Sequence, residues 1–502
     1  MTIVDRTRAA LDQAMAVYGG TDHAERLAAV RARLDEPLRI AVAGRVKAGK
    51  STLLNALVGE RLAPTDAGEC TRIVTWYRDG HTYEVIAYPR QGEPRQLRFN
   101  RDEGSLDVDL DGLSPDEVDE LVVTWPSQAL RTATLIDTPG IGSLSETSAR
   151  RTWQVLTADD ETPADAVLYL MRHLHPQDVE FLQAFHDTDA SRPNPINAIG
   201  VLSRADEIGV GRLDSMASAR RIATRLASDP KVRRVAQTVV PVAGLLAETA
   251  ATLTEAEVQQ LRKIANRSAR DVEGLLLSAD RFVEMMPELG LTSIERQELL
   301  DRFGLFGIRL ATALLRREVV STATELAREL AERSGVNDLR AVLDSLFFER
   351  RDILKSRSAL LALDALTRSE PRPGSETVAA TVEEIIASAH PFQELQVLSS
   401  LRAGWVTGRP AALEDLEHII GGAGGTVQHR LQLPDDADTA AVRGAATRAL
   451  TSWQQRAENP LTGHELAVAS RVAVRSCEGI LAELAHQPDG SRPAEDHEQV
   501  GQ

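Results

Sequence analysis

The sequence predicts an α/β head with a doubly wound, mainly parallel sheet, joined to an all-α neck and trunk that form a helical bundle. Two observations lead to this fold class. Between about residues 37 and 248, short apolar stretches alternate with helical patterns, which is typical of parallel strands covered by helices. Beyond about Leu253, apolar residues recur only at helical spacing. We therefore expect one mixed domain followed by helices alone.

Five apolar segments are predicted to be buried strands of the head: Arg39–Ala43, Thr132–Asp137, Val167–Met171, Asn197–Leu202 and Thr238–Val242. Each is short and apolar, as expected for a strand buried on both faces. In an open parallel sheet, ligands bind beyond the carboxyl ends of the strands. The residues that follow these strands are therefore the first candidates for a binding site.

A phosphate-binding loop follows the first of these strands. Its framing glycines permit backbone torsions that residues with a Cβ avoid, so the loop amides can converge on a phosphate. Lys50 is expected to reach the β- and γ-phosphates, and the Ser51 hydroxyl is expected to bind Mg²⁺. The segment matches the pattern G-x-x-x-x-G-K-[ST], and its predicted nucleotide-binding residues are Gly44, Arg45, Val46, Lys47, Ala48, Gly49, Lys50, Ser51 and Thr52.

A second motif, Asp-Thr-Pro-Gly, ends the strand at Asp137. Asp137 is expected to bind Mg²⁺ through water, and the Gly140 amide is expected to contact the γ-phosphate. Between the two motifs, GTP-binding proteins place a threonine that holds both the metal and the γ-phosphate. Thr71 is our preferred candidate and Thr65 is the alternative. The expected metal ligands are therefore Ser51, Thr71 and Asp137.

The base is expected to be selected at Ser203-Arg204-Ala205-Asp206, where a later strand ends. The Asp206 carboxylate can accept two hydrogen bonds from guanine N1 and N2, a pattern that adenine does not offer. The usual guanine motif is [NT]-K-x-D, so Ser203 and Arg204 both depart from it; an arginine can still lie flat over the base. Backbone amides of Val242 and Ala243 would complete the pocket. These residues favour GTP, and an assembly or signalling ATPase remains the alternative.

The order of these motifs, followed by long helices, resembles the bacterial dynamin-like proteins and most closely the actinobacterial isoniazid-inducible dynamin-like GTPases. Residues 64–67, 71–76, 302–309 and 332–335 also match that family. The resemblance implies a GTPase that uses Mg²⁺ and converts GTP and water to GDP and phosphate. It also implies a neck built partly from the N-terminal helices, head-to-head self-association that depends on the nucleotide, and membrane remodelling.

On this basis the chain is divided into six parts: N-terminal neck helices at 1–36, a GTPase domain at 37–248, neck helices at 249–335, a helical trunk or stalk at 336–435, C-terminal helices returning to the neck at 436–486, and a disordered tail at 487–502. The N-terminal helices need later helices to pack on. Residues Val336–Thr367 read as one long helix with no internal cap, which suggests an extended stalk.

The catalytic machinery for hydrolysis looks incomplete. Ile141 follows Gly140 where small GTPases carry a water-positioning glutamine, and Val46 cannot hydrogen-bond a water. Some relatives of dynamin carry a cis arginine finger in the phosphate loop, at the position of Lys47. Lys47 is therefore a candidate to place positive charge on the phosphates when two heads meet, and a solvated surface lysine is the alternative. The expected catalytic residues are Lys50, Thr71 and Lys47.

The composition of the chain limits which binding partners and which cellular compartment are expected for the protein. The net charge of −17 argues against a nucleic-acid partner, which needs a basic footprint. The two cysteines, Cys70 and Cys477, form no disulfide framework and fit a reducing cytosol. No apolar run approaches the length of a membrane-spanning helix, and Met1–Ala10 has no apolar core of a signal peptide. We expect a cytoplasmic protein, to which the resemblance adds peripheral contact with the inner leaflet of the plasma membrane.

Direct lipid insertion has little support in the sequence. The reversal at Ser369–Ser375 is polar, and the other candidate wedges are Pro391-Phe392 and Gly404-Trp405-Val406. Single apolar residues insert weakly. Two functions therefore stay open: a membrane-remodelling GTPase, or a GTPase that acts mainly as the binding partner of a sister dynamin-like protein.

Overall fold

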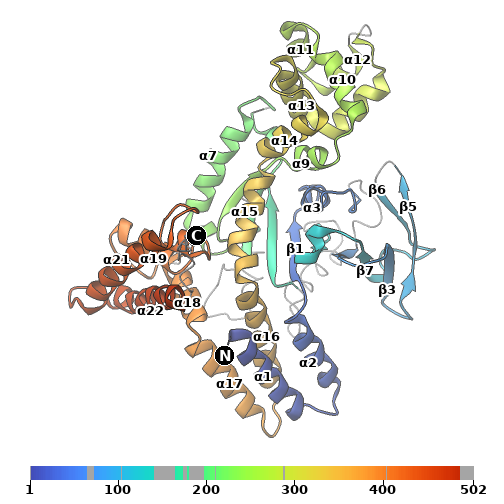
Figure 1. The fold of residues 1–502 in the computed structure, drawn as a ribbon. Helices are drawn as coiled ribbons and strands as arrows, with labels where there is room; N and C mark the ends of the chain where they lie inside the picture. Colours follow the sequence, from blue (N-terminus) through green and yellow to red (C-terminus); the bar gives the residue numbers. More distant parts are fainter. Residues whose placement is uncertain are drawn as a thin grey trace, which may run out of the picture. The chain divides into compact units, whose positions relative to one another are not determined.

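The computed structural model describes residues 2–64, 73–102, 105–140, 164–172, 178–179, 197–209, 211–285, 289–402 and 404–486. The candidate switch threonines, Thr65 and Thr71, lie outside the described residues. The chain divides into two compact units, residues 1–387 and 388–502. Figure 1 shows the elements of both. The finer division into six parts stays a prediction.

Among its described residues, the first unit is built on a nine-stranded sheet with the order β11-β10-β9-β1-β8-β2-β7-β3-β4. The strands are β1 (Leu38–Gly44), β2 (Val74–Arg78), β3 (Glu84–Pro89), β4 (Arg95–Gln96), β7 (Val118–Thr124), β8 (Ala133–Asp137), β9 (Ala166–Met171), β10 (Ala198–Ser203) and β11 (Val239–Val242). From β11 to β8 every pair is parallel. Beyond β8, only β2 and β7 pair in parallel, and the other pairs are antiparallel. The predicted mainly parallel α/β head is confirmed.

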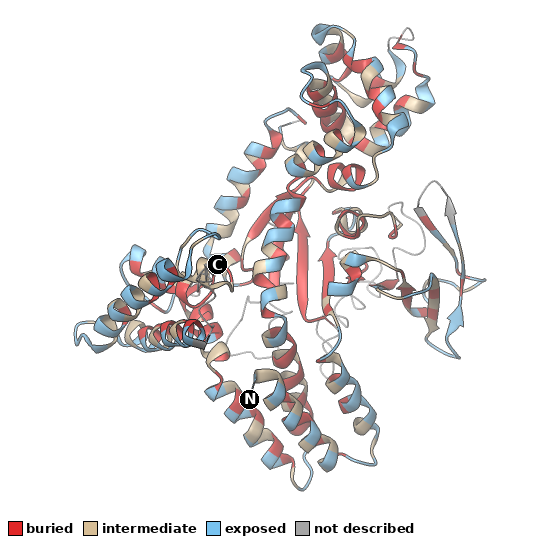
Figure 2. Cartoon of the chain, in the orientation of Figure 1, coloured by how far each residue is buried: buried red, intermediate tan, exposed pale blue. Residues whose placement is uncertain are grey.

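All five predicted strands are present, as β1, β8, β9, β10 and β11, each within one residue of its expected ends. Every residue of β8, β9, β10 and β11 is buried, as Figure 2 shows in red. This burial explains why they read as continuous apolar runs. A separate antiparallel pair, β5 (Arg98–Asp102) with β6 (Ser105–Asp109), extends from the chain between β4 and β7.

Helices that connect or cover the strands carry the binding loops. They are α3 (Lys50–Val58), α4 (Gln128–Thr132), α7 (Ser215–Ser228), α8 (Pro230–Arg233) and α9 (Gly244–Ala251), with a short 3-10 helix at Ala205–Glu207. Helix α3 packs against α9, and α7 packs against β11. The loop after β1 and the loop after β11 are thereby fixed to each other through their helices.

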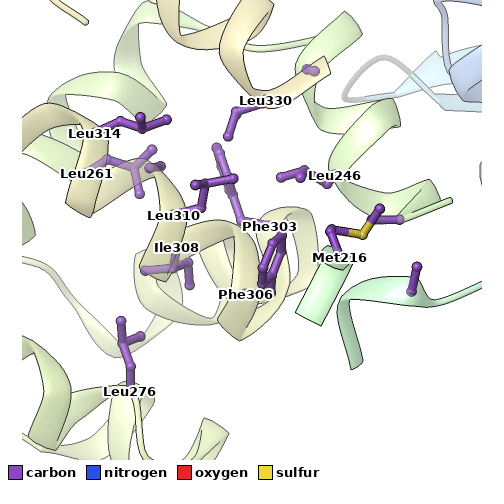
Figure 3. Close-up of a cluster of buried hydrophobic side chains, with 14 of the residues drawn as sticks. Met216, Leu246, Leu261, Leu276, Phe303, Phe306, Ile308, Leu310, Leu314 and Leu330 are labelled. Carbon is purple, nitrogen blue, oxygen red and sulfur yellow. The ribbon is translucent and has the colours of Figure 1, made fainter. Parts of the chain in front are cut away.

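A group of five helices follows: α10 (Glu255–Ala265), α11 (Ala269–Leu275), α12 (Ala279–Glu284), α13 (Ser293–Arg316) and α14 (Ala323–Ser334). Capping boxes at Thr254, Thr292 and Thr322 set the starts of α10, α13 and α14. Their apolar residues share one buried cluster with α7 and α9, part of which Figure 3 shows. Helix α13 bends at Gly304, whose φ of 62° and ψ of 172° are not helical.

The prediction of a single long helix at Val336–Thr367 is wrong. The structure has α15 (Val336–Leu346), a 3-10 turn at Phe348–Arg350 and α16 (Arg351–Ser369). The helical path is interrupted at Arg350, where φ is −109° and ψ is 11°. Phe347 is fully buried at this break. The apolar spacing continues on both sides of the turn, so periodicity alone did not reveal it.

The N-terminal helices, α1 (Ile3–Val17) and α2 (Asp22–Arg33), pack against α16. Helix α1 also contacts α17 (Ser375–Ser388), because Arg6 pairs with Glu384 at 3.1 Å. The buried Lys355 ammonium of α16 donates to the carbonyl of Leu34, at 3.1 Å, and to that of Glu36. This contact holds the chain just before β1 against the helix that follows the head.

The described part of the second unit is all helical, with α18 (His390–Arg402), α19 (Pro410–Ile419), α20 (Val427–Arg430), α21 (Thr439–Glu458) and α22 (His464–His486). Helices α21 and α22 form a hairpin, and α18 and α19 pack on α22. Leu398, Leu416, Trp453 and Cys477 lie in its core. Burial raises the pKa of the Cys477 thiol to about 12, so this cysteine is unreactive in the folded unit.

Candidate nucleotide-binding site

The loop between β1 and α3 owes its path to two glycines. Gly44 has a φ of 147°, and a Cβ on it would lie 2.5 Å from the Leu170 carbonyl oxygen of β9. Gly49 begins α3 with a φ of 93°. A residue with a Cβ would be strained at both positions. The loop can therefore turn tightly over the ends of β1 and β9, with the amino end of α3 facing its interior.

The two phosphate motifs meet at Ser51 and Asp137. The Ser51 hydroxyl donates to Asp137 Oδ2 at 2.8 Å, and Asp137 lies at the end of β8, the parallel neighbour of β1. The other carboxylate oxygen, Oδ1, is buried and has no hydrogen-bond partner among the described residues. Burial raises the pKa of Asp137, and the nearby Lys50 opposes that shift. Burial likewise lowers the pKa of Lys50, whose Nζ lies 3.5 Å from the Gly44 carbonyl oxygen.

This arrangement fits a magnesium ion. A serine hydroxyl and a carboxylate are hard oxygen donors of the kind that Mg²⁺ prefers, usually with phosphate oxygens and water as the other ligands. An unpartnered buried carboxylate oxygen is costly unless a cation or donor satisfies it. Ser51 and Asp137 are thus the described residues that could hold the metal.

Gly140 lies directly against the phosphate loop. A Cβ on Gly140 would come within 2.8 Å of Val46 Cα and 2.9 Å of its nitrogen, so no other residue fits without moving the loop. The preceding Thr138 hydroxyl donates to the Val42 carbonyl of β1 at 3.0 Å. The second motif is therefore fixed next to the first.

The base end is a pocket between the loops that follow β1, β10 and β11. Its walls are Ala48, Gly49, Thr52, Leu53, Leu170, Val201, Ser203, Arg204, Asp206, Glu207, Val242, Gly244 and Leu245. Burial raises the pKa of the Asp206 carboxyl to about 6. Arg204 crosses the rim, where it donates to the Lys47 carbonyl at 3.2 Å and pairs with Glu207 at 2.7 Å. The arginine that replaces the usual lysine thus ties the base loop to the phosphate loop.

Most predicted residues converge here, with two qualifications. Ala243 adjoins the lining residue Val242, but its amide donates to the Ser334 carbonyl at 2.8 Å and is engaged within the protein. The side chains of Arg45, Val46 and Lys47 are exposed at the loop surface. Lys47 has a φ of 62°, and Arg172 also reaches its carbonyl, at 3.5 Å. The predicted roles of these residues in binding and catalysis stay predictions.

Sequence reasoning missed a buried polar network beside the loop helix. Asn55 accepts hydrogen bonds from the amides of Leu62 and Ala63, at 2.9 and 2.7 Å, and donates to Glu248 at 3.2 Å. Glu248 also pairs with Arg61 at 3.2 Å. The available signal was an asparagine in the otherwise apolar Leu53–Leu57, since a buried polar side chain needs partners. The network fixes the chain as it leaves α3.

Among the described residues, no helix has both the length and the apolar character needed to cross a bilayer.

Fold and site together define a P-loop protein of the dynamin type, and the sequence pattern of the Dynamin family matches residues 40–205. The chain is 42% identical to the isoniazid-induced protein IniC of Mycobacterium tuberculosis over 493 residues, which is 97% of this chain and 99% of that protein. It belongs to the dynamin family, in the group of IniC.

More distant relatives match over shorter stretches. The bacterial dynamin-like protein of Nostoc punctiforme is 33% identical over 150 residues, which cover 28% of this chain and 21% of that protein. The isoniazid-induced protein IniA of Mycobacterium tuberculosis is 29% identical over 229 residues, which cover 37% of this chain and 34% of IniA.

Proposed function

We propose that the protein binds GTP with Mg²⁺, hydrolyses it to GDP and phosphate, and couples this cycle to head-to-head self-association and membrane remodelling. The observation that carries the proposal is the hydrogen bond between Ser51 and Asp137. It joins two motifs 86 residues apart, and the loop residues Gly49 and Thr52 beside it line a pocket that also contains Asp206. Such a constellation suits a nucleoside triphosphate with its metal.

Each end of the candidate site has a distinct task. Lys50 and the amides of the loop bind the β- and γ-phosphates, with the amino end of α3 adding favourable charge. Ser51 and Asp137 would hold Mg²⁺, which would supply positive charge beside the same phosphates. Asp206 accepts hydrogen bonds from guanine N1 and N2, and Arg204 covers the base. Because Thr71 is assigned from sequence alone, its role as switch threonine is part of the proposal.

Lys47 is proposed to act on the phosphates of GTP when two heads meet. Its side chain is exposed on the loop, where a partner head can change its surroundings. The carbonyl of the same residue is held by Arg204 and Arg172, so the loop backbone is anchored while the side chain is exposed. An ammonium that reaches the γ-phosphate only in the dimer would stabilise charge in the transition state.

A nucleotide assay tests the GTPase assignment. Purified protein should release phosphate from GTP in the presence of Mg²⁺, and chelation of the metal should stop the release. ATP should compete for the site far more weakly than GTP. If ATP displaced bound GDP as well as GTP does, the assignment of Asp206 as the base-selecting residue would be wrong.

Two exposed apolar side chains of the second unit are the candidates for contact with lipid. Of the predicted wedges, Phe392 and Val406 are buried, while Trp405 is 51% exposed. Leu461, in the turn between α21 and α22, is 93% exposed. Two isolated side chains give weak insertion by themselves. The alternative, a GTPase that acts mainly as the partner of a sister dynamin-like protein, therefore remains.

Vesicle co-sedimentation separates the two functions. The protein is mixed with anionic phospholipid vesicles, with and without a nonhydrolysable GTP analogue. Binding by the protein alone, weakened by Trp405→Ser and Leu461→Ser, supports direct remodelling. Binding only when a sister dynamin-like protein is added supports the partner role.

A further inference from the structure

Helix α13 lies outside the sheet, yet it touches the loop that presents Asp206. We propose that Arg309 of α13 is a positioning residue for guanine selectivity: its guanidinium holds the Gly211 carbonyl and so fixes the loop that carries Asp206. The inference rests on the proposed function, because it takes Asp206 to be the residue that recognises the base.

Arg309 bridges two segments that are far apart in sequence. Its Nη1 donates to the carbonyl of Gly211, five residues beyond Asp206, and its Nη2 donates to the Leu276 carbonyl, after α11, at 2.7 Å. A guanidinium offers several donors in a fixed plane, so one side chain can hold two carbonyls in a defined relation. A lysine at this position would keep the charge but lose this geometry.

The bend of α13 brings the helix backbone to the same loop. At Gly304, a Cβ would lie 4.0 Å from Asp206 Oδ2 and 3.7 Å from Leu245 Cδ2, and both of those residues line the base pocket. The torsions of Gly304 belong to a region that is essentially restricted to glycine. The bend therefore lets α13 pass directly behind the base-recognition wall.

Apolar packing makes α13 a firm support rather than a loose neighbour. Phe303 and Phe306, on either side of the bend, are buried in one cluster with Met216 of α7 and Leu246 of α9 (Figure 3). The Phe306 Cβ lies 3.7 Å from the position that a Cβ on Gly211 would take. Because aromatic rings on both sides fix the helix, Arg309 starts from a well-defined position.

The same helix supplies a matched control. Arg302, two residues before the bend, pairs with Glu257 at 2.7 Å and donates to the hydroxyl and carbonyl of Thr252, at 2.9 and 3.0 Å. Those partners lie after α9 and on α10, not in the loop that carries Asp206. Removing Arg302 should weaken the attachment of α13 without releasing the base loop.

The test compares GDP with IDP, since inosine lacks the 2-amino group that donates to Asp206. Affinities of both are measured by calorimetry for the wild-type protein, Arg309→Ala, Arg309→Lys and Arg302→Ala, together with each melting temperature. Arg309→Ala should reduce the preference for GDP over IDP by about tenfold, the scale of one hydrogen bond to a charged group. Arg309→Lys keeps the positive charge but loses the planar set of donors, and should reduce the preference for GDP over IDP by about threefold. Arg302→Ala should lower the melting temperature and leave the preference unchanged.

A second measurement excludes a general loss of structure. In an Asp206→Ala background the preference is already lost, so adding Arg309→Ala should change it by less than about twofold. A wild-type preference in both Arg309 variants would overturn the inference, as would an equal loss in Arg302→Ala. A wild-type protein that binds ADP as well as GDP would instead overturn the proposed function, and the inference with it.

Discussion

The phosphate end and the base end of the candidate site are built in different ways. The phosphate end comes from one continuous loop, residues 44–52, with Asp137–Gly140 placed beside it by the neighbouring strand. The base end combines the loops after β10 and β11 with α13, a helix outside the sheet. A continuous loop is specified by a short motif, whereas an assembled wall depends on packing between distant segments. Variants should therefore damage one end and leave the other intact.

The largest effect is expected at the phosphate end. Lys50→Ala should lower GTP turnover by about 10²–10³-fold, because a charge directed at the transferring phosphoryl group is lost. Its effect on ITP should be the same, since the base end is untouched. The measurement is phosphate release at saturating nucleotide. Lys263→Ala, which removes an exposed lysine of α10, is the control and should behave as the wild-type protein does.

At the base end, Asp206→Asn should exchange the preferred base. An asparagine amide can donate to the C2 carbonyl of xanthine, where guanine carries an amino group. The preference for XTP relative to GTP should therefore rise by about 10²-fold. Turnover at saturating XTP should approach the wild-type value with GTP, because the phosphate end is unchanged. Competition of GDP and XDP for the site measures the exchange. No gain for XDP would mean that Asp206 does not face the base.

Lys47 separates binding from chemistry within the phosphate end. Lys47→Ala should lower GTP turnover by at least about tenfold while changing GDP affinity by less than about twofold, because the side chain is expected to act only in the transition state. Lys47→Arg keeps the charge and serves as the control. Turnover is measured over a range of protein concentrations. Unchanged turnover in Lys47→Ala would contradict a cationic finger at this position.

The smallest expected effect is a pH dependence that belongs to the base end. The pKa of Asp206 is raised to about 6 in the nucleotide-free protein, and guanine needs the ionised carboxylate. Protons therefore compete with GDP as the pH falls through that value. Affinity at about pH 5 should be about tenfold weaker than at about pH 8. The Asp206→Ala variant is the control, because the phosphates of GDP titrate in it as in the wild-type protein. An identical pH profile of GDP affinity in that variant would show that Asp206 does not cause the pH dependence.

The same contrast separates what the sequence could predict from what it could not. The phosphate loop and its strand were predictable, because motif and apolar run are both local. The bend at Gly304 was not, since Phe303, Phe306 and Leu310 keep helical spacing through it and an isolated glycine in a helix is ambiguous. The contact of Arg309 with Gly211 joins residues 98 apart, and neither segment has a sequence pattern that predicts it. Contacts that hold a site in place from distant parts of the chain are thus the hardest to predict from sequence.

The contact between Lys355 and the chain before β1 has a consequence for synthesis. It joins α16 to residues that are synthesised before the head. The ion pair of Arg6 likewise cannot form until Glu384, 378 residues later, has been synthesised. At the usual rate of about 5–20 residues per second, that delay is roughly 20–75 seconds. During this time the apolar faces of α1 and α2 have no α16 to cover them, so these two helices are made before the head and reach their final packing after it.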